Sequence, residues 1–184
     1  MRWISFFILA YVVLGLQTGI SAAMQWRGSG PNLVLLAVVF IAINAPRDVA
    51  LLGSFILGAM QDLCTQGTMG LYALSYGLVA MFVVTAQQAV YREHPLTHFS
   101  MTLIAGLMTA GVLYIHDWLR PPGAARVTDA GQHLAAVRYP LLPMIYTAVY
   151  TALLGVVVLG LLQRSKRVFQ FQAPRRQRMT ARGR

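Results

Sequence analysis

The sequence predicts an all-α integral membrane protein, a bundle of six transmembrane helices. The chain of 184 residues is 57% hydrophobic and only 11% charged, whereas an ordinary soluble domain carries about 25% charged residues. The apolar residues gather in long runs that short polar or Pro- and Gly-containing segments interrupt. Lipid explains this composition, because apolar side chains that face acyl chains need no protein core to cover them.

The first predicted span covers residues 3–24. About 20 helical residues cross a bilayer core of about 30 Å, and Arg2 and Trp26-Arg27 flank the run as interface anchors. A signal peptide is the alternative. It is disfavoured because the apolar run is longer than the usual h-region of roughly 7–15 residues and no clear small-x-small cleavage site closes it.

Two short helices are predicted next, at 32–44 and 49–63, separated by a turn at Pro46-Arg47-Asp48. With a rise of about 1.5 Å per residue each reaches only about 20–25 Å, which requires a thinner bilayer or shielding by neighbouring helices. A single kinked helix would instead place both charges near mid-membrane at about 2.5–3.5 kcal/mol each. Mismatch costs only fractions of a kcal/mol per Å, so two helices are favoured.

Three longer spans complete the predicted bundle, at 71–90, 98–118 and 141–162. Pro143 lies in the first turn of the last span, where its missing N–H costs little. The segment 120–140 is the one long outer connection, and Thr128-Asp129 predicts the cap of a short helix over 130–137.

The basic residues predict that both ends of the chain lie in the cytoplasm. Six spans place eleven Lys and Arg residues inside and four outside, and cytoplasmic segments carry such an excess. Residues 1–163 thus form the transmembrane domain, followed by a basic tail over 164–184 that is expected to be disordered. Anionic lipid is favoured over nucleic acid as its ligand, because the tail follows a membrane end. The candidate lipid-binding residues are Arg164, Lys166, Arg167, Arg175, Arg176 and Arg178.

Asp62 is the leading candidate for a functional residue, because acidic side chains within membranes are rare and usually functional. It is expected near the outer end of its helix, where its carboxylate can accept hydrogen bonds from N–H groups of the loop Thr65–Gly70. This structural role is favoured over a proton or ligand site. Gly67 and Gly70 are expected to supply backbone conformations with positive φ.

Small residues four positions apart mark candidate helix contacts, because they let helix backbones approach closely in lipid. Ser54/Gly58 has this spacing and is expected to pack within the bundle, with a contact to a partner helix as the alternative. Gly15/Gly19 has it too, and either packs inside or faces a partner helix. Arg47 is interpreted as part of the cytoplasmic turn rather than as an ion pair with Asp48.

Catalytic and metal chemistry find little support in the sequence. His116-Asp117 resembles a catalytic dyad, but it adjoins Trp118 at a span end and no serine or cysteine nucleophile follows nearby. A single Cys64 excludes an intrachain disulfide and a cysteine metal cluster. No cofactor is expected.

The segment from Pro31 to Tyr76 carries an ordered set of motifs, namely a Pro-Asn-Leu start, a basic turn, a Gly-x-x-x-Asp helix end and a Gly-Leu-x-Ala-x-x-Tyr continuation. In this order the motifs resemble the core signature of the MreD family, the membrane subunit of the bacterial rod-shape complex. They fall at Pro31-Asn32-Leu33, Pro46-Arg47, Gly58 to Asp62, and Gly70-Leu71-Tyr72-Ala73 to Tyr76.

The resemblance implies a non-enzymatic scaffold of the elongasome in the bacterial inner membrane. Such a scaffold pairs with MreC, a single-span protein with a large outer domain, and supports lateral peptidoglycan synthesis. MreB, RodA and a penicillin-binding transpeptidase are the further partners that the family implies. The family also implies a six-helix fold similar to the substrate-binding subunits of energy-coupling vitamin transporters.

Three functions therefore compete. A scaffold predicts small-residue grooves for partner helices and no polar pocket. A transporter subunit predicts a polar pocket near the outer face, and an intramembrane enzyme is disfavoured by the missing catalytic set. The polar residues available for such an outer pocket are Gln61, Asp62, Thr65, Gln66, His116 and Asp117.

Overall fold

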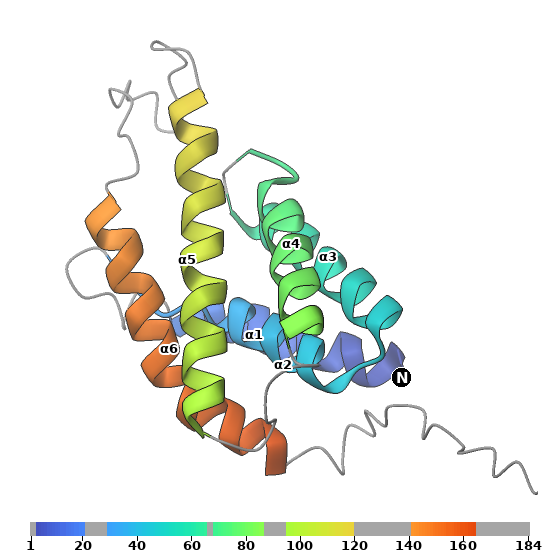
Figure 1. Cartoon of the computed structure of the whole chain (residues 1–184). Helices are drawn as coiled ribbons and strands as arrows, with labels where there is room; N and C mark the ends of the chain where they lie inside the picture. Colours follow the sequence, from blue (N-terminus) through green and yellow to red (C-terminus); the bar gives the residue numbers. More distant parts are fainter. Residues whose placement is uncertain (1–2, 21–28, 66–67, 87–94, 120–140, 165–184) are drawn as a thin grey trace, which may run out of the picture.

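A computed structural model describes residues 3–20, 29–65, 68–86, 95–119 and 141–164 of the chain, and these residues form helices and short connections without a strand. Each of the six predicted spans corresponds to one helix (Figure 1). The helices are α1 (Trp3–Ile20), α2 (Leu33–Asn44), α3 (Arg47–Cys64), α4 (Leu71–Ala86), α5 (Pro95–Leu119) and α6 (Leu141–Arg164).

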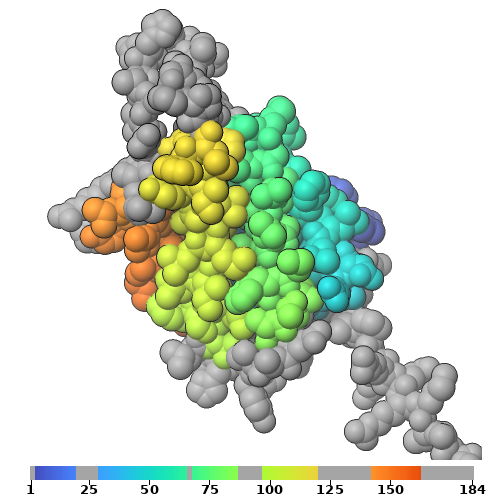
Figure 2. Space-filling view, turned by 45° about the horizontal axis from the view of Figure 1, so that its top comes forward, coloured from blue at the N-terminus to red at the C-terminus, as the bar shows by residue number. Residues whose placement is uncertain are grey.

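Four of the helices form two pairs, and α2 contacts both pairs, with α1 packed against α2 and α3. α5 and α6 form one antiparallel pair, and α3 and α4 form the other (Figure 1). Figure 2 shows α5, α4 and α3 side by side on one face of the molecule. The short helix α2 packs against each of the other five helices.

α2 is the core of the bundle. Its residues from Val34 to Ile43 are all buried, on every side of the helix. A helix that is apolar all round is stable only where other elements or lipid surround it. Here neighbouring helices surround α2. Because α2 contacts protein rather than lipid, it need not be as long as the bilayer core is thick.

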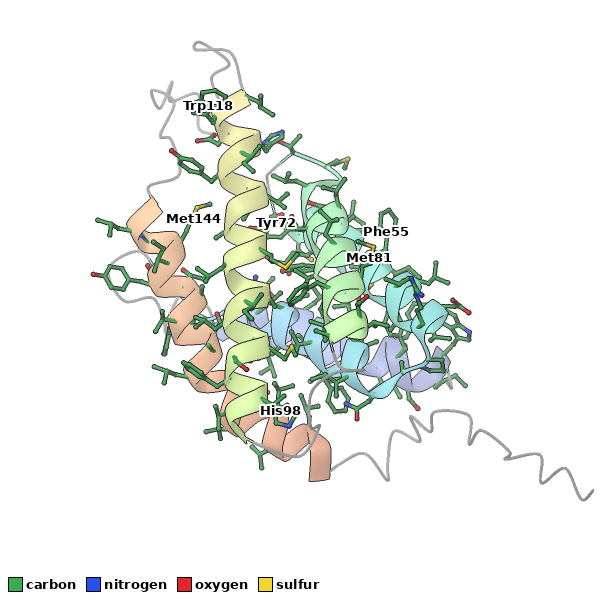
Figure 3. The ribbon with its side chains drawn as sticks, viewed as in Figure 1. Phe55, Tyr72, Met81, His98, Trp118 and Met144 are labelled. Carbon is green, nitrogen blue, oxygen red and sulfur yellow. The ribbon has the colours of Figure 1, made fainter. Side chains whose placement is uncertain are left out.

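α3 has the reverse of a soluble helix's pattern, with large apolar side chains outside and polar ones inside. Leu52, Phe55 and Leu63 are exposed, whereas Gln61 and Asp62 are buried. Figure 3 shows Phe55 of α3 near Met81 of α4 on this apolar exterior. Such a surface is typical of a membrane protein, where lipid covers apolar side chains and helices contact through small and polar residues.

Two helices of the described part of the chain are long and apolar enough to cross a membrane, α5 over 97–119 and α6 over 142–162. α1, α2 and α4 are apolar but shorter. Six membrane crossings therefore remain a prediction, as does the orientation of the termini.

The start of α3 differs from the prediction. The helix was expected from Val49 after a turn at Arg47, but it begins at Arg47 itself, with Pro46 as its N-cap residue. The N–H of Ala50 donates to the carbonyl of Pro46 (2.8 Å) and closes the first turn. Asp48 is favourable in that turn because the helix N-terminus carries partial positive charge. Both charged residues are exposed.

Gly58 brings α3 against the backbone of α4. A Cβ atom at this position would lie 2.5 Å from the Tyr72 carbonyl oxygen and 2.5 Å from the Ala73 Cα. Ser54, one turn earlier, is also fully buried. This pair therefore packs within the bundle and offers no surface to a partner.

We expect Gly58→Ala to destabilise the fold, because the new methyl group would meet main-chain atoms that cannot move independently. Overpacking of this kind costs about 1–3 kcal/mol or more. Gly160→Ala is the matched control, since a Cβ there meets nothing within 4 Å. The thermal unfolding midpoint of detergent-purified protein should fall for Gly58→Ala alone. Equal midpoints for the two variants would contradict the close approach.

Candidate functional site

Asp62, in the last turn of α3, caps the beginning of α4 with its carboxylate. Oδ2 accepts hydrogen bonds from the backbone N–H of Gly70 (3.1 Å) and of Ala73 (3.0 Å). Oδ1 accepts from the N–H of Tyr72 (3.0 Å). The side chain is only 5% exposed. One buried carboxylate thus satisfies three of the N–H groups that a helix start leaves without an intrahelical partner.

This arrangement extends what the sequence predicted for Asp62. Of its three donors only Gly70 lies in the predicted loop, and the other two belong to the first turn of α4. Negative charge is favourable there because of the helix dipole. Gly70 has φ +90°, as expected, which a residue with a Cβ rarely adopts. Gly67 lies outside the described residues.

A second polar centre surrounds the N-terminus of α2. The side chain of Asn32 caps this helix, with Oδ1 accepting from the N–H of Leu35 (2.9 Å). Its amide also pairs with the buried hydroxyl of Tyr76, at 2.9 Å from Nδ2 and 3.2 Å from Oδ1. The N–H of Asn32 donates to Thr151 Oγ1 in α6 (2.9 Å).

Gln17 of α1 completes this centre. Its Oε1 accepts from the N–H of Leu33 (2.6 Å), and its Nε2 donates to the carbonyl of Pro31 (3.2 Å). Side chains from α1, α4 and α6 therefore meet at the point where α2 begins. We call Gln17, Asn32, Tyr76 and Thr151 the Asn32 network.

Sequence reasoning singled out Pro31 but missed the Asn32 network as a site. Asn directly before an apolar run is a recognisable N-cap signal, and Gln17 and Thr151 are polar residues inside apolar runs. Their partners could not be inferred, because Asn32 and Thr151 are 119 positions apart. The two polar centres share α4, where the rings of Tyr72 and Tyr76 pack with centroids 5.7 Å apart.

A pocket of about 440 Å³ adjoins the Asn32 network, between α5 and α6. Figure 3 shows two of its lining residues, Tyr72 and Met144, on either side of α5. A scaffold was predicted to have no polar pocket, and the lining of this pocket is mostly apolar. The pocket is also not the predicted polar pocket, because none of the residues expected for that pocket is among the described ones that line it. Its lining includes Asn32, Tyr72, Ala110, Leu113, Met144 and Thr147.

The remaining candidate residues lie apart from both centres. Gly15 and Gly19 are exposed on α1, and a Cβ at either would meet nothing within 4 Å. His116 and Asp117 are half-buried at the end of α5 beside exposed Trp118 (Figure 3). Arg164 is the last residue of α6, and the rest of the basic tail lies outside the described residues, as does the short helix expected over 130–137. Among the described residues no three His, Cys, Asp or Glu side chains form a possible metal site.

Apolar exteriors, buried polar helix caps and two helices of spanning length define an α-helical integral membrane protein. The chain belongs to the MreD family, because the family model "rod shape-determining protein MreD" matches residues 1–122, which include α1 to α5. Family membership implies a role in determining rod shape. No curated protein and no solved structure matches the chain, so the likeness to vitamin-transporter subunits remains a prediction.

We expect Asp62→Ala to reduce the amount of folded protein in the membrane rather than to leave a stable, inactive protein. Hydrogen bonds to a charged group contribute about 1.5–3 kcal/mol each, and three are lost. Asp62→Asn should be milder, because one oxygen can still accept. Asp48→Ala, which removes an exposed acid from the same helix, is the control. Normal abundance and thermal stability of Asp62→Ala would refute the structural role.

We expect Tyr76→Phe to lower thermal stability, because it removes the hydroxyl that pairs with Asn32 and keeps the ring. A buried polar group left without its partner costs about 1–3 kcal/mol. Tyr146→Phe is the matched control, since Tyr146 is 55% exposed. The comparison of unfolding midpoints in one detergent measures the effect. No difference between the two variants would mean that the Asn32 network contributes little to stability.

Proposed function

We propose that this protein is a non-enzymatic scaffold of the elongasome in the bacterial inner membrane. It would pair with an MreC-like single-span protein and support lateral peptidoglycan synthesis, with MreB, RodA and a penicillin-binding transpeptidase as further members of the complex. Membership of a shape-determining family supports this proposal. The structural observation that carries it is an open helix face on α1.

This α1 face is defined by Ile4, Ile8, Tyr11, Gly15 and Gly19. Ile4 is 75% and Tyr11 is 80% exposed, and both glycines have open space above them. The positions recur every three or four residues and therefore share one side of the helix. α1 packs on α2 and α3 through its opposite side, and among the described helices none covers this face. A partner helix can approach closely at the glycines, as helix association in lipid requires.

The second candidate function is that of a substrate-binding subunit of a vitamin-type transporter. The pocket between α5 and α6 favours it, since such a subunit needs a ligand cavity. Against it, the carboxylate of Asp62 is engaged by three backbone N–H groups, and none of the described residues that line the pocket is charged.

Co-purification tests the scaffold. The detergent-solubilised chain should retain an MreC-like protein. Gly19→Leu should weaken that association about tenfold, which corresponds to about 1.4 kcal/mol, because helix packing in lipid depends on close approach. Gly160→Leu, at an equally open glycine on α6, should leave it unchanged. Equal effects of the two variants would exclude the α1 face. Retention of an ATPase module and a stoichiometric vitamin-like ligand, without an outer-domain partner, would favour the transporter subunit.

The proposed orientation places the beginning of α3 in the cytoplasm and its end outside. Both positions offer exposed residues, Asp48 at the beginning and Cys64 at the end. A membrane-impermeant maleimide applied to intact spheroplasts should label the native Cys64. In a Cys64→Ala background, Asp48→Cys should react only after lysis. The opposite pattern would reverse the orientation, and labelling of both in intact spheroplasts would mean that α3 does not cross the membrane.

A further inference from the structure

The pocket between α5 and α6 has a structural cause. The two helices touch where Gly106 meets Ala148, and a Cβ on Gly106 would lie only 2.9 Å from the Ala148 Cβ. From this crossing toward Leu119 and Leu141 the cavity of about 440 Å³ lies between the two helices. Its lining there is Thr109, Ala110 and Leu113 of α5 and Pro143, Met144 and Thr147 of α6. Its volume lies in the range of about 300–1,000 Å³ that is typical of small-molecule sites.

The lining selects for an uncharged ligand. Among the described residues that line it, none is Asp, Glu, Lys, Arg or His, so an ionised group beside them would be buried without a counter-charge. Leu35, Leu113 and Met144 supply apolar contacts. This mostly apolar surface with a few convergent polar groups is the usual composition of a binding site for small molecules.

Asn32 and Thr151 both line the pocket and are hydrogen-bonded to each other. The amide nitrogen of Asn32 has two hydrogens, and its bond to Tyr76 uses one of them. Thr151 Oγ1 accepts from the N–H of Asn32 and donates to the Thr147 carbonyl (2.6 Å), and Thr151 is fully buried, so it positions Asn32 rather than contacting a ligand. The second amide hydrogen of Asn32 can thus donate to a ligand.

We propose that this pocket binds a neutral lipid with a slender apolar body and an uncharged hydroxyl or carbonyl group, which accepts a hydrogen bond from the Asn32 amide. An apolar side chain of a partner helix fits the pocket less well, because it would cover this amide without pairing it. The site goes beyond the scaffold function and does not depend on it.

Photolabelling tests the site in the full-length protein reconstituted in lipid vesicles. The probe is a decanol analogue with a photoreactive diazirine, and labelled peptides are located by mass spectrometry. Label should appear on α5 near Leu113 and on α6 near Met144. Unlabelled decanol should compete about tenfold better than decane, which lacks the hydrogen-bonding group, and better than the charged decanoate. Equal competition by all three would overturn the proposal.

Variants separate the pocket from the general lipid surface. Ala110→Phe fills the pocket and should abolish the labelling, whereas Leu107→Phe adds similar bulk on the exposed side of the same helix and should preserve it. Met144→Trp fills the pocket from α6 and serves if Ala110→Phe does not fold. Undiminished labelling of a folded pocket-filling variant would refute the site. Loss of an MreC-like partner from such a variant, combined with unselective labelling, would assign the pocket to a partner side chain instead.

Discussion

The structure depends on hydrogen-bond acceptors for the backbone N–H groups at the beginning of α2 and of α4, which lie inside the bundle. Lipid offers no such acceptor, so every backbone N–H at membrane depth must find one in the protein. α4 obtains its acceptor from Asp62, and α2 obtains its acceptors from Asn32 and Gln17. Each start is therefore fixed by side chains rather than by apolar packing, which has no preferred direction.

The capping of α4 by Asp62 depends on the close packing of α3 against α4. Gly58 and Asp62 are four residues apart and so lie on the same side of α3. Gly58 lies against the backbone of Tyr72 and Ala73, and Asp62 accepts the N–H groups of these same two residues. A larger residue at position 58 would move the carboxylate away from its donors. The sequence motif from Gly58 to Asp62 thus has a geometric reason, because the short carboxylate reaches α4 only if the two backbones are close.

Sequence patterns predict local features of this fold well and contacts between distant segments poorly. The apolar runs place all six helices, since helix length and polar interruptions are visible in a few neighbouring residues. The sequence could not predict that α2 is the core, because an apolar run such as Val34 to Ile43 has the same pattern whether lipid or protein surrounds it. Asp62 was predictable because its donors lie at most eleven residues away. The Asn32 network and the pocket together combine residues of α1, α2, α4, α5 and α6, and no periodicity relates them.

The central position of α2 resolves the conflict between its length and the bilayer. Twelve residues rise about 18 Å, well short of a bilayer core of about 30 Å. Because protein surrounds α2, the unpaired backbone groups at its ends need polar partners within the protein. The Asn32 network supplies these partners at the beginning of α2. Gln17 of that network lies between Gly15 and Gly19 in the sequence of α1. A partner helix on the α1 face would therefore dock onto a helix whose other side is tied to the core, which gives a scaffold a fixed orientation for its partner.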